Sequence, residues 1–338
     1  MNTFNTTKTA IAFVIAAAAS AGTFGIANAC TSAIYNNADV SMTVRTMDWF
    51  GQDKAQMVGK GKGMTNTYSD SDEAVTTQSK YASLQIKSFN PGLVAEAINE
   101  KGLVARILYL GKDYTEFPEG KAGVPDVAAG EVPRYIVDNF STTNEAIAAL
   151  QSIDVIDQEI CNLPGHANEC ISAPVHYQIT DASGNSAVIE YVKGEQKIYQ
   201  GTYETAPGVQ FMSNDPEFST HLIMDQEQTE PNASIRSYDR RLRAKEIVED
   251  MHSRNVTDPA QAALSIKAVG ANVFSGYDRL DPYVDSVFPT LWTIYTDQAN
   301  KSVVLDRADT WEIEHYDFTM FDTNAPAETV LGQNPNVK

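Results

Sequence analysis

Alternating apolar and polar positions predict a chain rich in β-strands. The side chains alternate between Met42 and Arg45, which is typical of a half-buried strand, and similar runs recur along the sequence. The predicted strands are residues 41–46, 82–88, 103–110, 175–193, 208–213, 290–296 and 302–306. Helical patterns are fewer and cover residues 131–152, 236–252 and 259–270. Since neither an internal repeat nor a Pro- or Ser-rich linker interrupts the series, one domain is predicted.

Turn signals join neighbouring strands into hairpins. Residues 36–39 read Asn-Asn-Ala-Asp and predict a turn whose second arm begins at Ser41. Residues 99–102 and 181–184 each end in Gly and lie between apolar runs, so they predict two more hairpin turns. The last two of these turns are interpreted as structural.

Capping signals mark two helix starts. Residues 141–145 read Ser-Thr-Thr-Asn-Glu before an apolar run, and Asp258 precedes a Pro that suits the first helical position. Residues 51–80 are polar and Gly-rich, and we expect a loop at the edge of a substrate entrance. The polar tail after residue 322 is expected to fray.

The first 29 residues predict a removable export signal. Lys8 supplies the positive charge, residues 10–19 form an apolar run too short to span a bilayer, and residues 27–29 read Ala-Asn-Ala, a small-x-small cleavage site. Cleavage there leaves Cys30 as the first residue of a single catalytic domain, residues 30–338, located in the periplasm or secreted. The alternatives are an uncleaved anchor and a lipoprotein, although Ala27 stands where a lipoprotein signal usually has Leu. No later apolar stretch of 18 residues predicts a membrane span.

Composition and charge narrow the class of partner. Apolar residues make up 43% and charged residues 20%, which is typical of a globular domain. The net charge is −19 at pH 7, and without the leader's one Lys the chain carries 24 basic against 44 acidic residues, or −20. Nucleic acid is therefore not an expected partner, because phosphate binding needs clustered Lys and Arg.

The three cysteines fall into a pair and a single residue. Cys161 and Cys170 lie nine apart across a turn-rich loop, and in an oxidising compartment we expect them to form a disulfide; the alternative is two buried thiols. Cys30 is the odd one. A thiolate is a strong nucleophile but needs a base, and a Cys at the N-terminus carries its own in the α-amino group.

Histidine is not needed for this chemistry. The five His residues stand at 166, 176, 221, 252 and 315 and form no local pattern around the single Cys. A papain-like Cys–His protease therefore remains only an alternative, which predicts loss of activity on replacing one particular His. Close His pairs of the metal-binding kind are absent from the sequence, so no metal and no cofactor are expected.

A hairpin after Cys30 would fold two charged residues back beside its thiol. Arg45 would lower the pKa of the thiol, and Asp48 would hold and orient the α-ammonium group. The alternative is an ordinary surface ion pair in a loop.

From these residues onward, the chain resembles the choloylglycine hydrolase family, which includes penicillin V acylases and conjugated bile acid hydrolases. The resemblance starts with Cys30-Thr31 and, after the hairpin, Arg45-Thr-Met-Asp48. Tyr109 falls where penicillin acylases tend to carry Tyr and bile acid hydrolases Asn. The further similar segments, in chain order, are residues 97–104, 177–191, 211–218, 237–244 and 292–297.

The resemblance implies an α+β fold, the four-layer αββα sandwich of N-terminal-nucleophile hydrolases, with two antiparallel sheets between helices. It implies that Cys30 is the nucleophile and its α-amine the base, with Arg45 beside the thiol and Asp48 orienting the amine and sulfur. The reaction would be amide hydrolysis through a thioester on Cys30.

The same resemblance implies an oxyanion hole from the backbone N–H of Tyr109 and the side chain of Asn214, with Arg240 steadying the network. From the residues alone, Asn214 is equally an Asx-turn before Asp-Pro, and Arg240 a solvated residue on a helix. The Arg240 motif departs from the family in carrying Arg241 where Phe is usual.

The expected substrate is a small-molecule N-acyl amide. Nearby aromatics are Trp49, Phe50, Tyr109, Tyr114 and Phe117, of which Trp49 and Tyr109 are the predicted substrate-binding residues. Tyr109 favours the penicillin V acylase type, and N-acyl homoserine lactones are a further candidate. The alternatives are a conjugated bile acid hydrolase and a non-enzymatic exported lipoprotein. Family likeness also implies a homotetramer.

Overall fold

The structure is a computed structural model that describes residues 30–37, 39–51, 53–89, 93–161, 168–228, 232–276, 280–281 and 286–333. The predicted export signal, residues 1–29, lies outside the described residues, and its cleavage stays a prediction. Among the described residues, no helix has the length and hydrophobicity to cross a membrane.

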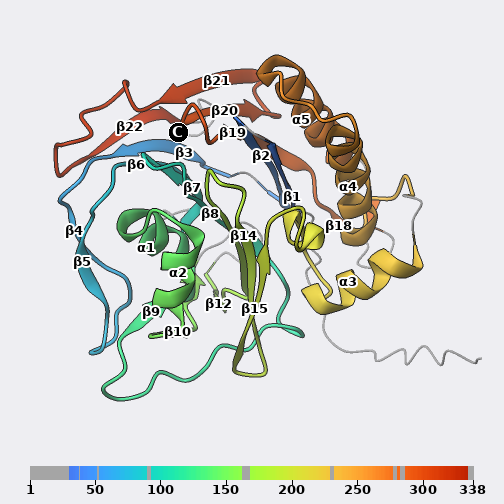
Figure 1. Ribbon diagram of the computed structural model, residues 1–338. Helices are drawn as coiled ribbons and strands as arrows, with labels where there is room; N and C mark the ends of the chain where they lie inside the picture. The colour runs from blue at the N-terminus through green and yellow to red at the C-terminus, as the bar shows by residue number, and fades with distance from the viewer. Residues whose placement is uncertain are drawn as a thin grey trace, which may run out of the picture.

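Two antiparallel sheets form the centre of the molecule (Figure 1). The six-stranded sheet has the order β16 (Phe211–Ser213), β1 (Thr31–Asn37), β2 (Val40–Asp48), β19 (Thr290–Asp297), β20 (Ser302–Arg307) and β21 (Glu312–Asp317). The eight-stranded sheet has the order β15 (Glu195–Gly201), β14 (Ser186–Val192), β13 (Val175–Thr180), β8 (Val104–Tyr109), β7 (Leu93–Asn99), β6 (Ser83–Ser88), β3 (Gln56–Lys60) and β22 (Glu328–Gln333).

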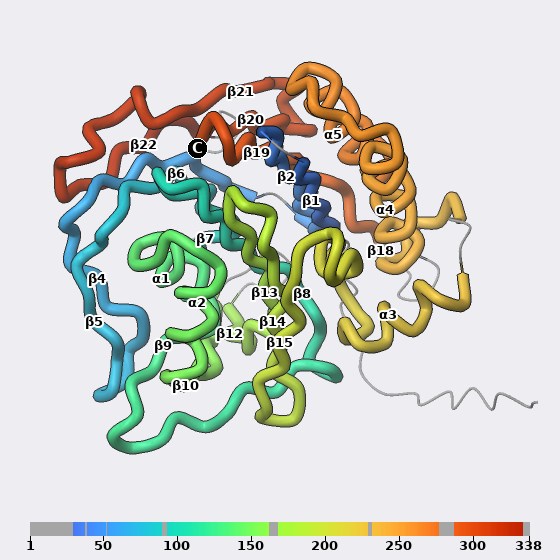
Figure 2. Tube along the Cα trace, viewed as in Figure 1, coloured from blue at the N-terminus to red at the C-terminus, as the bar shows by residue number. Residues whose placement is uncertain are grey.

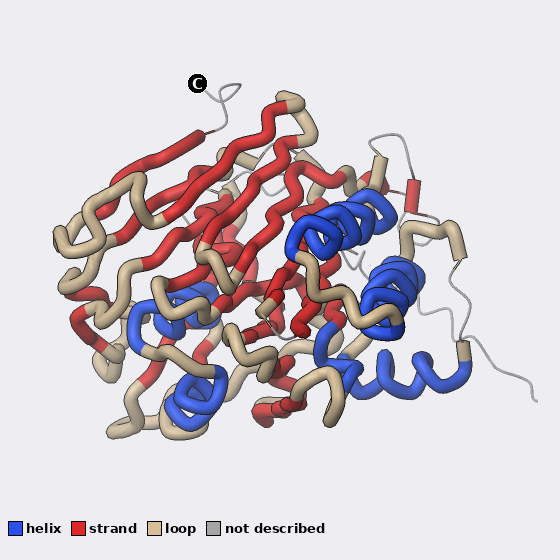
Figure 3. The backbone as a smooth tube through the Cα atoms, turned by 45° about the horizontal axis from the view of Figure 1, so that its top comes forward, coloured by secondary structure: helices blue, strands red, loops and turns tan. Residues whose placement is uncertain are grey.

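Helices cover the outer face of each sheet (Figure 3). One apolar core lies between the six-stranded sheet and helices α4 (Ser237–Ser253) and α5 (Pro259–Val273). A second lies between the two sheets, and a third between the eight-stranded sheet and helices α1 (Val132–Asn139) and α2 (Thr143–Leu150). These four layers confirm the αββα prediction. A fifth helix, α3 (Phe218–Glu227), follows β16.

Short elements complete the described chain. They are two 3₁₀ turns (Ala129–Glu131 and Pro207–Gln210) and four strand pairs: β4 (Thr65–Thr67) with β5 (Thr76–Gln78), β9 (Asp126–Ala128) with β10 (Asp154–Ile156), β11 (Glu159–Cys161) with β12 (Cys170–Ser172), and β17 (Leu280–Asp281) with β18 (Ser286–Val287).

The alternation on β2 decides which side chains reach the space between the sheets. Met42 and Val44 pack under α4 and α5, whereas Met47 lies in the core between the sheets. Because side chains alternate across a strand, Arg45 points to the same face as Met47. The hairpin register pairs Thr31 with Thr46, so Cys30, just before β1, lies beside the end of β2.

Several element predictions need correction. The predicted helix 131–152 is two helices, because the backbone is extended at Phe140 and a capping box on Thr142 starts α2. The first three residues of the predicted strand 208–213 belong to a 3₁₀ turn, since Pro207 opens one. Asp258 caps α5 as predicted, accepting a hydrogen bond from the Ala260 backbone N–H.

Two segments predicted as irregular contribute strands. Residues 51–80 include β3, β4 and β5, and the tail after residue 322 includes β22, which pairs with β3 at the edge of the eight-stranded sheet (Figure 2). Pairing with a neighbouring strand stabilises these segments as strands, although their polar sequences do not predict a strand.

Candidate active site

Cys30 is a buried thiol at one end of the space between the sheets. Its side chain is 2% exposed, and its Sγ lies 3.9 Å from Arg45 Nη2, 3.9 Å from Met47 Sδ and 3.9 Å from the Asp48 carbonyl oxygen. Burial raises the pKa of the Cys30 thiol, and the Arg45 guanidinium is the strongest influence that lowers it. The structure therefore places a cation next to the sulfur, as the hairpin predicted.

Arg45 is a buried cation with few hydrogen bonds. Its Nη2 donates to the Ile107 carbonyl at 3.2 Å, and its guanidinium carbon lies 4.6 Å from the centre of the Trp292 ring. Its Nε and Nη1 have no hydrogen-bond partner among the described residues. The positive charge is therefore held by packing and left available to the sulfur.

Asp53 fixes the ring beneath that guanidinium. The Trp292 Nε1 donates to Asp53 Oδ2 at 2.8 Å, and the same carboxylate accepts from Ser88 Oγ at 2.7 Å and from the Phe89 backbone N–H at 2.8 Å. Sequence reasoning missed Asp53, because it lies in the segment predicted as an entrance loop.

Asp48 lies fully buried at the end of β2. Its Oδ1 accepts from Thr290 Oγ1 at 2.6 Å, its Oδ2 accepts from Thr46 Oγ1 at 3.3 Å, and Arg240 Nη1 lies 3.5 Å from Oδ2. Burial raises the pKa of Asp48 to about 6, although the Arg240 guanidinium opposes the shift. The carboxyl therefore changes charge near neutral pH.

Arg240 ties three segments together. It lies on α4 with 1% of its surface exposed, which excludes the solvated-helix interpretation. Besides Asp48, it donates through Nη1 to Thr31 Oγ1 and through Nη2 to Asn214 Oδ1 at 3.2 Å. Its Nε donates to the Ile235 carbonyl at 2.8 Å.

Asn214 lies beside the backbone of Tyr109, and their role as an oxyanion hole stays a prediction. The Asn214 Nδ2 donates to the Tyr109 carbonyl oxygen at 2.7 Å, so the side chain is engaged across the site rather than only in a local turn before Pro216. Leu110 N–H donates to the Pro174 carbonyl on the β13 side of β8. Along a strand, the N–H and carbonyl of one residue point to one edge, and those of the next residue point to the other edge. The N–H and carbonyl of Tyr109 and the carbonyl of Ile107 therefore point to the edge of β8 that faces away from β13. This edge faces Arg45 and Asn214.

An apolar pocket opens beside the sulfur. Trp49 forms one part of its wall and lies 6.2 Å from Tyr109, 5.2 Å from Phe89 and 5.2 Å from Phe50, ring centre to ring centre. The lining residues are Cys30, Arg45, Met47, Trp49, Phe89, Leu93, Ala95, Ile107, Leu108, Tyr109, Ile160, Ile171, Ser172, Ala173, Pro174 and Val175. Phe117 packs on Tyr191 instead. The two predicted substrate-binding residues thus both line the pocket.

The described histidines lie in other environments. His176 pairs with Glu190 at 2.9 Å, His252 stacks on Tyr203, His221 packs against Tyr238, and His315 is on the edge strand β21. His166 lies outside the described residues. The polar contacts of the Cys30 sulfur among the described residues are with Arg45, Met47 and Asp48, so a papain-like pair has no support there.

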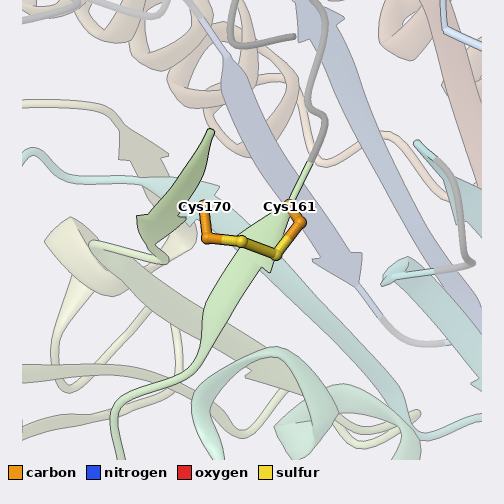
Figure 4. Close-up of a disulfide and its surroundings, with 2 residues drawn as sticks. All are labelled: Cys161 and Cys170. Carbon is orange, nitrogen blue, oxygen red and sulfur yellow. A yellow bond between two sulfur atoms is a disulfide. The ribbon is translucent and has the colours of Figure 1, made fainter. Parts of the chain in front are cut away.

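Cys161 and Cys170 are directly opposite each other on β11 and β12, and their sulfurs are bonded. Figure 4 shows the bond between the two strands. Sequence reasoning named this pair but missed that its hairpin supplies Ile160, Ile171 and Ser172 to the pocket.

The fold and site define a class of enzyme. A family model described as linear amide C–N hydrolases, choloylglycine hydrolase family, matches residues 30–244, and the chain belongs to this family. A curated relative is the penicillin V acylase of Pectobacterium atrosepticum, 29% identical over 206 residues. That match covers 58% of this chain and 52% of the relative, so the chain spans about half the length of the curated relative it matches.

Solved structures agree in fold. The penicillin V acylase from Agrobacterium tumefaciens superposes with a TM-score of 0.75 at 25% identity, covering 90% of this chain and 92% of that chain. A variant of conjugated bile acid hydrolase from Clostridium perfringens gives a TM-score of 0.73 at 16% identity, covering 90% and 97%. The second likeness shows the fold alone.

Proposed function

We propose that the protein is an exported amidohydrolase that cleaves N-acyl amides with an apolar acyl group, using Cys30 as an N-terminal nucleophile after removal of residues 1–29. The observation that carries this proposal is the thiol beside Arg45 in the wall of an apolar pocket that Tyr109 also lines, with the Asn214 side chain bonded to the Tyr109 backbone. The family match begins at Cys30, which agrees with a mature chain that starts there.

The first half of the reaction forms a thioester. The freed α-amine of Cys30 takes the thiol proton, directly or through water, and Arg45 stabilises the thiolate. The thiolate attacks the amide carbonyl, and the Tyr109 N–H and Asn214 Nδ2 stabilise the oxyanion. The α-ammonium then gives its proton to the leaving amine.

The second half releases the acid. The neutral α-amine takes a proton from water, which attacks the thioester, and the thiolate leaves. Asp48 holds the α-amine in place when ionised. Arg240 fixes the relative positions of Asp48, Thr31 and Asn214 through hydrogen bonds to their side chains.

The pocket favours an aromatic or linear apolar acyl chain. Trp49, Phe89 and Tyr109 contribute aromatic rings, and the rest of the wall is mainly aliphatic. We therefore place phenoxyacetyl amides such as penicillin V first, together with N-acyl homoserine lactones. Both relatives named penicillin V acylase support this order over bile acid conjugates.

The test joins the intact mass of the mature protein to an assay of penicillin V hydrolysis. We expect a chain that starts at unmodified Cys30, one adduct with a thiol-directed inhibitor, and loss of activity in that adduct and in Cys30→Ser. Assays with an acyl homoserine lactone and a glycine-conjugated bile acid rank the substrates. An active protein with a retained leader or a lipidated Cys30 would contradict the mechanism, because an acylated α-amine is not a base. The predicted homotetramer is read by light scattering on the same sample.

A further inference from the structure

The disulfide-closed hairpin β11–β12 forms one wall of the pocket. Ile160 and Ile171 are directly opposite each other in the register, so their side chains lie on one face of the hairpin, and both line the pocket that contains Cys30. Ser172, the next residue of β12, also lines the pocket. Trp49 and Phe89 line the same pocket. The position of Ile160 and Ile171 therefore helps to decide which acyl group fits beside these rings.

The disulfide joins the two strands at the outer end of this wall. The two strands have three residues each, and in the described chain they pair only with each other, not with either main sheet. An isolated two-stranded hairpin is marginally stable in water. Burial adds little, because Ile160, 9% exposed, is the only buried residue of the two strands.

The other end of the hairpin is anchored to the body of the protein. The Ala173 N–H donates to the Gln158 carbonyl at 3.0 Å, and the Gln158 side chain accepts from the Gly130 N–H at 2.9 Å. Ser172 Oγ donates to Asp157 Oδ1 at 2.7 Å. Along the ladder, the Ile160–Ile171 pair therefore lies between this anchored base and the Cys161–Cys170 pair.

The sulfurs themselves do not face the substrate. Since neighbouring side chains on a strand point to opposite faces, Cys161 and Cys170 lie on the face away from the isoleucines, and Cys170 is exposed. Neither cysteine lines the pocket. Any effect of the disulfide on substrate choice must therefore act through the position of Ile160 and Ile171.

We propose that the Cys161–Cys170 disulfide is a specificity-determining crosslink: it fixes the Ile160–Ile171 wall in the position that favours aryl-acyl groups over short acyl groups. This inference rests on the proposed amide hydrolysis. It assigns the disulfide a positioning role, separate from the nucleophile and the oxyanion hole.

The crosslink is first checked by alkylation of the denatured, unreduced protein. We expect one adduct, at Cys30, and three adducts would overturn the proposal. The double variant Cys161→Ser/Cys170→Ser is then compared with Glu159→Gln, a matched change of an exposed side chain on the same hairpin. The substrates are acetyl, hexanoyl and phenoxyacetyl amides of one leaving amine.

We expect the double variant to lose about tenfold in the ratio of kcat/KM for phenoxyacetyl over acetyl, mainly through KM, a size typical of altered hydrophobic contacts. The kcat of the double variant for the acetyl amide, and the kcat/KM ratio of Glu159→Gln, should stay within about twofold of the wild-type values. An unchanged ratio in the double variant would overturn the proposal. If this variant does not fold, wild-type protein reduced with a trialkylphosphine, which leaves Cys30 a thiol, is measured against the same expectation.

A second readout separates the two hypotheses. Cys30 is alkylated with chloroacetamides that carry the same acyl-like groups, and the alkylation rates are compared. This selectivity can be measured even in a protein that hydrolyses no amide. If the wild type is alkylated selectively but cleaves no amide, only the proposed function is contradicted. The crosslink proposal then stands if loss of the disulfide abolishes the alkylation selectivity and fails if the selectivity persists. A wild type that cleaves amides, with a double variant of unchanged selectivity, contradicts the crosslink alone.

Discussion

Neutralising Arg45 should slow every reaction of the Cys30 thiolate. In Arg45→Gln the side chain keeps a similar length but loses the charge that lies 3.9 Å from the sulfur. Two unit charges at that distance interact by about 4 kcal/mol at an effective dielectric constant of about 20, equivalent to a factor of about 1,000. The remaining thiolate becomes more nucleophilic as the pKa of the thiol rises, which offsets part of the loss. We therefore expect a rate lower by roughly 10–1,000-fold at pH 7.

The assay is the rate of Cys30 alkylation by iodoacetamide between pH 5 and 10, read by intact mass. The sign follows from the charge: without the cation, the pKa of the thiol rises, and the rate profile moves to higher pH. Arg45→Lys is the matched control, because it keeps the charge but loses the guanidinium plane over Trp292. A folded Arg45→Gln protein, checked by circular dichroism, with an unchanged rate and profile would refute this account of the thiol.

Three further changes test other parts of the site. Asn214→Ala should lower kcat by about 10²–10³ with little change in KM, measured by steady-state hydrolysis of penicillin V; a change confined to KM would argue against an oxyanion role. Asp48→Asn should remove the fall in activity as pH drops through about 6, where the wild-type carboxylate takes up a proton, and a persisting limb would assign it to another group. The pKa of Asp48 in the folded protein lies above its ordinary value, so its contribution to stability is full below about pH 4 and is lost as pH rises through about 6. Urea unfolding should therefore show a free energy of unfolding that falls over this pH range in the wild type but not in Asp48→Asn. Asp53→Asn leaves one acceptor for the three donors at that carboxylate and should lower the free energy of unfolding by about 1–3 kcal/mol, and an unchanged urea midpoint would show that the contacts to Trp292 and its neighbours are dispensable.

The sequence predicted those parts of the site that depend on local patterns. The hairpin after Cys30 follows from a turn signal and strand alternation, and it was enough to bring Arg45 and Asp48 to the thiol. The capping box of α2 and the Asp258 cap of α5 were also predictable, because capping depends on residues within one turn of each other.

Contacts between distant segments were not predictable from such patterns. Arg240 lies 192 residues from Asp48, and only the family resemblance linked it to the site. Asp53 and the pocket wall at Ile160 depend on how β19 and β11 pack, which no local signal encodes. The strand β22 was missed because its order comes from pairing with β3 rather than from its own polar sequence.

The short disulfide loop also bears on how the chain would fold in an oxidising compartment. Three thiols allow three pairings, and only the Cys161–Cys170 pairing leaves Cys30 free. Closing this loop joins residues nine apart, whereas joining Cys30 to Cys161 would close a loop of about 130 residues. In an unfolded chain the longer loop costs about 2.4 kcal/mol more in closure entropy, so the local pairing is favoured by roughly 50-fold. Chain connectivity alone thus directs oxidation away from Cys30 before any tertiary structure protects it.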